Sequence, residues 1–124
     1  MLVLIVEPDD ARAVRWCRAL EGLGGTTVTA RTQAAAIRVL RERTVALVVL
    51  NLDLPEDGAF AVAEFASYAR PGAKVLFVSA SDRLADGSVF GHAANACGFL
   101  GADSRPEDIA AIAAYHAGGW REAG

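Results

Sequence analysis

The residues of this sequence whose types could support chemistry follow directly after short apolar runs. Asn51 ends one run and Asp53 lies two residues further on, Glu7 stops another run, and Ser79 ends a third. The carboxyl ends of parallel strands meet at one edge of an open α/β sheet, where ligands usually bind. If these runs are strands, the side chains gather at that edge. Their oxygens are of the kind that a hard cation takes.

The apolar runs alternate with helical patterns along the chain. The run that ends in Asn51 is unbroken, rich in β-branched residues and too short for a typical helix, as expected of a strand covered on both faces. Strands are expected at 2–6, 26–29, 45–50, 74–78 and 98–100. Helices are expected at 11–23, from 31 or 32 onward, at 59–68, at 86–96 and after 104. This alternation predicts a three-layer, doubly wound α/β domain with a parallel sheet and right-handed crossovers.

Local signals refine the expected helices. Asp9 or Asp10 is expected to cap the first helix, and Ser104 and Glu107 resemble a capping box at the start of the last one. Within the first helix, Trp16 falls on the apolar face, whereas Arg12 belongs to the mainly outward face.

Bulk composition limits the possible functions. The 124 residues fit a single domain over 1–124, and 53% of them are hydrophobic. The net charge is −3 and there is no block of Lys and Arg, which argues against direct nucleic-acid contact. The two cysteines, Cys17 and Cys97, form no CxxC motif and are expected to be buried free thiols. The run at 2–6 is too short for a membrane span and lacks a basic leader, so we expect a cytoplasmic protein with no membrane contact.

Three segments resemble the receiver domain of two-component response regulators. They are Val-Leu-Asn-Leu-Asp-Leu-Pro-Glu-Asp-Gly at 49–58, Val-Leu-Phe-Val-Ser-Ala at 75–80 and Ala-Cys-Gly-Phe-Leu at 96–100. The resemblance covers about 2–114. It implies the flavodoxin-like strand order 2-1-3-4-5. It also implies a family chemistry in which a phosphoryl group is transferred to an aspartate beside a bound magnesium.

This sequence departs from the family pattern at three of five positions. Glu7 retains the first acidic place after the first strand, but Pro8 occupies the second. Asn51 stands where the family has the acceptor aspartate, Ser79 retains the hydroxyl, and Ala102 lies where a lysine is expected. A neutral amide is a much poorer nucleophile than a carboxylate. Alanine cannot meet the charge on the phosphoryl oxygens.

The resemblance therefore predicts an atypical receiver, or pseudo-receiver, that is not phosphorylated at the usual site and is not an enzyme. It would act in signal transduction or transcriptional control through protein contacts. No cofactor is expected; a weak magnesium site at Glu7 and Asp53, with help from Asp9, is the minor alternative. Two other functions stay open: a residual phosphoacceptor that uses Asp53 or Asp57, and a sensor that binds a small ligand in the altered site.

Simpler interpretations also stay open for single residues. Asn51 could be a turn residue, Asp53 a solvated acid, and Ser79 a partner of local backbone. Phe99 falls at the family's aromatic switch position, and plain packing is the alternative. The resemblance places the surface for a protein partner or a homodimer at 86–116. Small residues there were expected to allow close approach: Ala93, Ala94, Ala110, Ala113 and Ala114.

Overall fold

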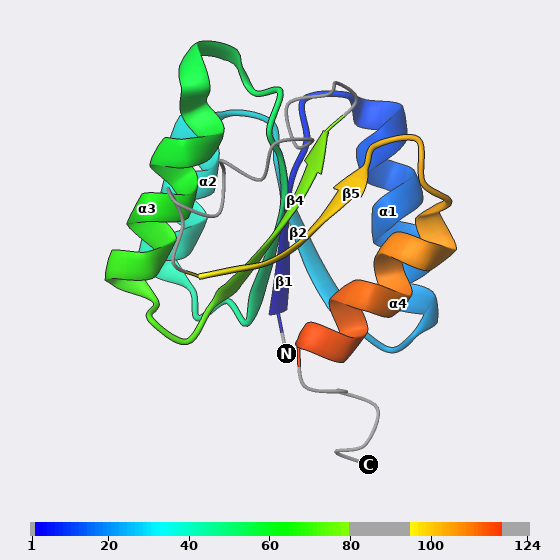
Figure 1. Ribbon diagram of the computed structural model, residues 1–124. Helices are drawn as coiled ribbons and strands as arrows, with labels where there is room; N and C mark the ends of the chain where they lie inside the picture. Colours follow the sequence, from blue (N-terminus) through cyan, green and yellow to red (C-terminus); the bar gives the residue numbers. More distant parts are fainter. Residues whose placement is uncertain (1, 80–94, 118–124) are drawn as a thin grey trace.

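A parallel sheet of five strands lies between two layers of helices in the computed structural model, which describes residues 2–79 and 95–117 (Figure 1). The strands are β1 (Leu2–Val6), β2 (Thr26–Ala30), β3 (Leu47–Asn51), β4 (Lys74–Ser79) and β5 (Ala96–Gly101). Their order is β2-β1-β3-β4-β5, and every neighbouring pair is parallel. The predicted α/β class and strand order are thus confirmed.

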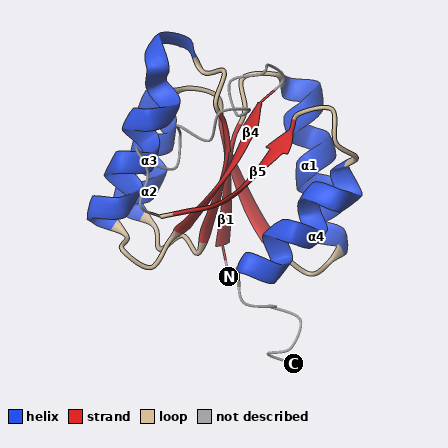
Figure 2. Ribbon diagram, in the orientation of Figure 1, coloured by secondary structure: helices blue, strands red, loops and turns tan. Residues whose placement is uncertain are grey.

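The helices cover the two faces of the sheet in pairs. They are α1 (Asp10–Gly22), α2 (Gln33–Glu42), α3 (Gly58–Ala69), which follows the short 3₁₀ turn η1 (Pro55–Asp57), and α4 (Pro106–His116). Helices α2 and α3 lie on one face, and α1 and α4 lie on the other (Figure 2). Residues 86–94 of the helix expected at 86–96 lie outside the described residues, and Ala96, its expected last residue, begins β5 instead.

Two apolar cores result from the alternation of side chains along the strands. In β1, Leu4 and Val6 join the core under α2 and α3, whereas Val3 and Ile5 join the core under α1 and α4. This is the two-residue period of a strand whose two faces are both covered. Trp16 is buried in the second core, as its place on the apolar face predicted.

Side-chain caps begin the first two helices. Asp9 is the N-cap of α1 and accepts a hydrogen bond from the backbone N–H of Ala11, at 3.0 Å. Thr32 caps α2 in the same way and accepts from Ala35 at 3.1 Å. Both positions agree with the predicted helix starts and fix where the loops after β1 and β2 end.

The predicted capping box at the last helix is wrong. The N-cap of α4 is Arg105, and no side chain caps it. Pro106 explains the shift, because a residue before proline avoids helical angles. Arg105 indeed has φ −62° and ψ 137°. Glu107 accepts a hydrogen bond from the Arg105 side chain instead, at 3.0 Å.

Two of the alanines expected to form a close-approach surface are buried within the domain. Ala110 and Ala113 face the sheet beside Ile109, in the core shared with α1. They lie on the inward stripe of α4, so they serve packing and are not available to a partner. The same part of the structure, 2–79 and 95–117, contains no helix that is both long enough and apolar enough to cross a membrane.

Candidate functional site

The expected polar side chains meet at the carboxyl edge of the sheet. Glu7, Asn51 and Ser79 follow or end three adjacent strands, and their exposed fractions are 1%, 3% and 2%. Asp53 lies beside them and is half-buried. We call Glu7, Asn51, Asp53 and Ser79 the strand-end cluster. Burial of so many polar groups requires that each find a hydrogen-bond partner.

The amide of Asn51 connects the cluster. Its Nδ2 donates to Oε1 of Glu7 at 2.8 Å, and its Oδ1 accepts from the backbone N–H of Asp53 at 2.7 Å. Only this orientation of the amide satisfies both contacts, because a flipped amide would set oxygen against oxygen and N–H against N–H. An aspartate here would face the carboxylate of Glu7 at hydrogen-bond distance without a shared proton. The site is therefore built for an amide.

The carboxylate of Glu7 is satisfied by this domain alone. Oε2 accepts from the backbone N–H of Asp9 at 2.9 Å, while the guanidinium of Arg12 lies 3.5 Å from Oε1. The Arg12 side chain is 26% exposed. A buried carboxylate with two hydrogen bonds and a nearby cation is the stable arrangement for such a group.

Arg12 is the site residue that the sequence-based prediction missed. It was assigned to the outward face of α1, yet its guanidinium turns toward Glu7. One signal was present in the sequence. Arg12 lies in the first turn of α1, where the helix dipole disfavours a positive charge. A cation at such a position suggests a compensating anion nearby.

Ser79 and Asp53 form the second half of the cluster. The Ser79 hydroxyl lies 3.1 Å and 3.3 Å from the two carboxylate oxygens of Asp53, to which it donates. Ala102 lies next to them, because its N–H donates to the carbonyl oxygen of Ser79 at 2.9 Å. Only a methyl group projects from this position, and it is buried. Pro8 is exposed on the rim.

These residues do not fit a magnesium ion in the arrangement observed. Glu7 already uses both oxygens, Asn51 directs N–H groups at it, and the Asp9 carboxylate caps α1. The side chain of Pro8 brings no ligand atom. Within 2–79 and 95–117, no group of three or more His, Cys, Asp or Glu side chains is placed to hold a metal. The weak magnesium site expected at Glu7 and Asp53 stays a prediction that this donor set does not favour.

Phe99 packs against the core beneath α3. Its ring stacks on that of Phe77, with centroids 5.5 Å apart and an interplanar angle of 15°. The ring of Phe77 in turn lies next to that of Phe60, with their centroids 6.4 Å apart. These contacts account for Phe99 as a packing residue, and the switch interpretation stays a prediction.

Comparison with known proteins finds similarity at the level of structure. No family model matches this sequence, and neither does any curated protein. A response regulator receiver domain protein (CheY-like) from Methanospirillum hungatei superposes with a TM-score of 0.83 at 24% identity, over 99% of this chain and 98% of that one.

Two further structures show the same similarity. A Burkholderia pseudomallei response regulator with a phosphorylated aspartic acid and a calcium ion gives a TM-score of 0.80 at 17% identity, over 98% of this chain and 71% of that one. An adenylate cyclase from Rhodopirellula baltica gives 0.83 at 15% identity, over 98% and 90%. This chain therefore has the fold of the CheY-like receiver domains of response regulators.

Proposed function

We propose that this domain is an atypical receiver that works in signal transduction or transcriptional control through protein contacts, without phosphorylation at Asn51 and without enzymatic activity. The observation that carries the proposal is the 2.8 Å hydrogen bond from the Asn51 amide to Glu7. It supports a site in which the amide is a structural partner of the acid. A phosphoacceptor would instead have to present a nucleophilic oxygen to its substrate.

The charge balance supports the same proposal. In the neighbouring structure from Burkholderia pseudomallei, a calcium ion accompanies a phosphorylated aspartic acid. Here, the Arg12 guanidinium and the Asn51 amide neutralise and solvate Glu7 from within the domain. Ala102 offers no positive charge to a phosphoryl group. The three departures from the receiver pattern act together against acyl-phosphate formation.

Regulation would then have to come from a binding partner. A ligand shifts a conformational equilibrium only through its different affinities for the two states. Without a phosphoryl group, a protein or a second copy of the chain would supply that difference. The β5–α4 side remains our proposed surface for it. Tyr115 is 79% exposed there, which supports a contact role in place of the buried alanines.

Intact-mass measurement after incubation with acetyl phosphate and magnesium tests this proposal. We expect the mass of the wild-type chain to stay unchanged. A stable gain of one phosphoryl group would overturn the proposal. The variants Asp53→Asn and Asp57→Asn, treated in parallel, would then locate the modified residue.

The residual-phosphoacceptor alternative has one observation in its favour. Asp53 is the carboxylate that contacts the Ser79 hydroxyl, and a phosphorylated receiver needs a hydroxyl near its acceptor. If Asp53→Asn alone abolished a mass gain, this alternative would replace the proposal. The ligand-sensing alternative predicts a rise in melting temperature with some nucleotide or metabolite, and a flat response throughout would count against it.

A further inference from the structure

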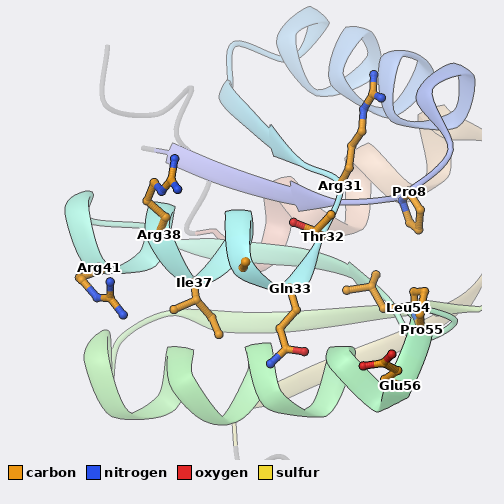
Figure 3. A pocket seen from close by; sticks show the side chains of 11 residues that line it. Pro8, Arg31, Thr32, Gln33, Ile37, Arg38, Arg41, Leu54, Pro55 and Glu56 are labelled. Carbon is orange, nitrogen blue, oxygen red and sulfur yellow. The ribbon is translucent and has the colours of Figure 1, made fainter.

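A groove of about 750 Å³ runs along α2, beside the strand-end cluster. It shares only Pro8 with the family positions of the site and is otherwise lined by residues of the loop before α2, of α2 itself and of the loop after β3. Figure 3 shows Arg38 and Arg41 at one end and Glu56 at the other, with Ile37 between them. The groove lies on the α2–α3 side of the sheet, away from the β5–α4 surface.

Contacts with α3 hold the wall of the groove in place. The Arg70 side chain, after the end of α3, donates from Nε to the carbonyl oxygens of Leu40 and Arg43, at 3.0 Å each. At the other end of α2, a Cβ on Gly58 would lie 3.1 Å from Oε1 of Gln33. The two helices thus approach closely at both ends of α2. The side chains of α2 are presented on a fixed scaffold.

The groove is positively charged on an otherwise acidic protein. Among the side chains that the structure describes, Arg31, Arg38 and Arg41 line it together with one acid, Glu56, whereas the whole chain has a net charge of −3. Arg31 forms an ion pair with Asp10, and Arg41 lies 5.9 Å from the ring centroid of Phe65. Within the described ranges, no carboxylate pairs with Arg38. Its exposed guanidinium is therefore available to an external anion.

An apolar strip accompanies the arginines. Ile37 is half-buried, and the exposed Pro8 and Pro55 continue the strip toward the loop after β3, over the buried Leu54. Glu56 in that loop has φ 57°, a left-handed conformation that costs energy for a residue with a Cβ. Such strain is often found at binding sites.

We propose that this groove binds an acidic peptide segment of a partner protein, one with an apolar side chain between its carboxylates. Arginine is suited to carboxylates because its planar donors can bind both oxygens. An apolar anchor among acidic residues matches Ile37 and Pro55, which lie between Arg38 and Glu56. A nucleic acid fits less well, because none of the described residues that line the groove is an aromatic that could stack on bases, and the overall charge is negative.

A titration with a defined peptide tests the proposal. The probe is the peptide Asp-Glu-Leu-Phe-Glu-Asp-amide with fluorescein attached to its N-terminal amine, and the matched control peptide replaces its acids by Asn and Gln. We expect saturable binding of the acidic peptide that weakens with added salt, and backbone amide shifts confined to 31–41 and 54–56. Arg38→Glu should weaken binding about threefold to tenfold. Arg18→Glu, the same charge change on an exposed site of α1, should leave it unchanged.

Several results would overturn the proposal: equal affinity for the neutral peptide, amide shifts elsewhere, or no effect of Arg38→Glu. Stronger binding of a double-stranded DNA fragment, lost in Arg38→Glu, would assign the groove to nucleic acid instead. The inference rests on the proposed interaction role, yet the two tests are separable. The titration does not depend on whether acetyl phosphate modifies the chain, and a phosphorylated chain could still bind the peptide.

Discussion

The strand-end cluster and the α2 groove lie side by side and treat their charges in opposite ways. In the cluster, the negative charge of Glu7 is buried and receives every partner it needs from the same chain. In the groove, the Arg38 guanidinium is exposed on the surface of α2. The first region is complete by itself, whereas the second is arranged to meet an anion from outside.

This difference follows from solvent access. A buried charge must be compensated during folding, because water is not there to do so. An exposed charge is already solvated, and a partner can replace that water at little cost. At the carboxyl edge of the sheet, where ligands usually bind in this class of fold, the polar groups thus satisfy one another within the domain. The groove whose arginine is open to a partner lies next to that edge.

The largest effect is expected from Asn51→Asp, which removes the hydrogen bond that the amide donates to Glu7. It sets two carboxylates against each other and should lower the free energy of unfolding by about 3 kcal/mol at neutral pH. Protonation of one of the two acids restores a donor, so the penalty should shrink as the pH falls. Urea denaturation at two pH values measures both effects.

The double variant Glu7→Gln with Asn51→Asp is the control for that result. It restores one amide and one carboxylate with the direction of the hydrogen bond reversed. Most of the lost stability should therefore return, and the double-mutant cycle gives the coupling energy. If the double variant were as unstable as the sum of the two single variants, the amide–carboxylate pair would not be the reason for Asn51.

Arg12→Met should have the next largest effect. It removes the cation beside Glu7 but leaves both hydrogen bonds to that carboxylate, so we expect a loss of about 1 kcal/mol. Arg15→Met, at an exposed position of the same helix, should change little. The difference between the two variants should decrease in high salt, and equal stabilities would show that Arg12 does not stabilise Glu7.

The variant Glu56→Gly tests whether the backbone of the groove is strained at this residue. Glycine adopts the positive φ of this residue without strain, so the free energy of unfolding should rise by about 0.5–1 kcal/mol. Glu56→Ala, which removes the charge but keeps the Cβ, should stay close to wild type. A loss of stability in Glu56→Gly would show that the loop conformation is not strained.

The smallest effect on stability is expected from the ionisation of the two thiols. Their alkylation rates can be compared between variants of the strand-end cluster and of the groove. Burial raises the pKa of Cys17 and of Cys97. The folded chain therefore keeps these protons at a pH where the unfolded chain has lost them. Their contribution to stability is complete below the unfolded pKa of about 8.5 and is lost as the pH rises through the folded values.

Alkylation by iodoacetamide followed by mass spectrometry should accordingly be slow at neutral pH and accelerate in alkaline buffer. It should be faster in Asn51→Asp, because global opening fully exposes both thiols, which are half-buried in the folded domain and not buried as the sequence predicted. Arg38→Glu, a surface change in the groove, should label at the wild-type rate. Faster labelling in that variant would link the groove to the stability of the core.

Much of the molecule follows from the sequence because its signals are local. Short apolar or β-branched runs located the described strands, 3.6-residue periods located the described helices, and the run ending in Asn51 placed an amide at the end of a central strand. A cap at Asp9 or Asp10 and a helix start at 31 or 32 could be predicted because a helix N-terminus depends on the adjacent turn of chain, and the structure selects Asp9 and Thr32. The helix start at Arg105, where no side chain caps α4, also has a local cause, because Pro106 follows it.

Only the tertiary structure decided which distant groups meet. The contact of Asn51 with Glu7 spans 44 positions, and its 2.8 Å length depends on how β1 and β3 align in the sheet. The turn of Arg12 toward that acid, the burial of Ala110 and Ala113, and the joining of Arg38 with Leu54 in one groove depend on how helices pack against strands. Periodicity assigns a residue to a face, but the neighbours across that face come from elements far away in the chain. For this reason the amide at the end of β3 could be read from residue types, whereas the pairing of Arg12 with Glu7 was established only by the packing of α1 beside that strand end.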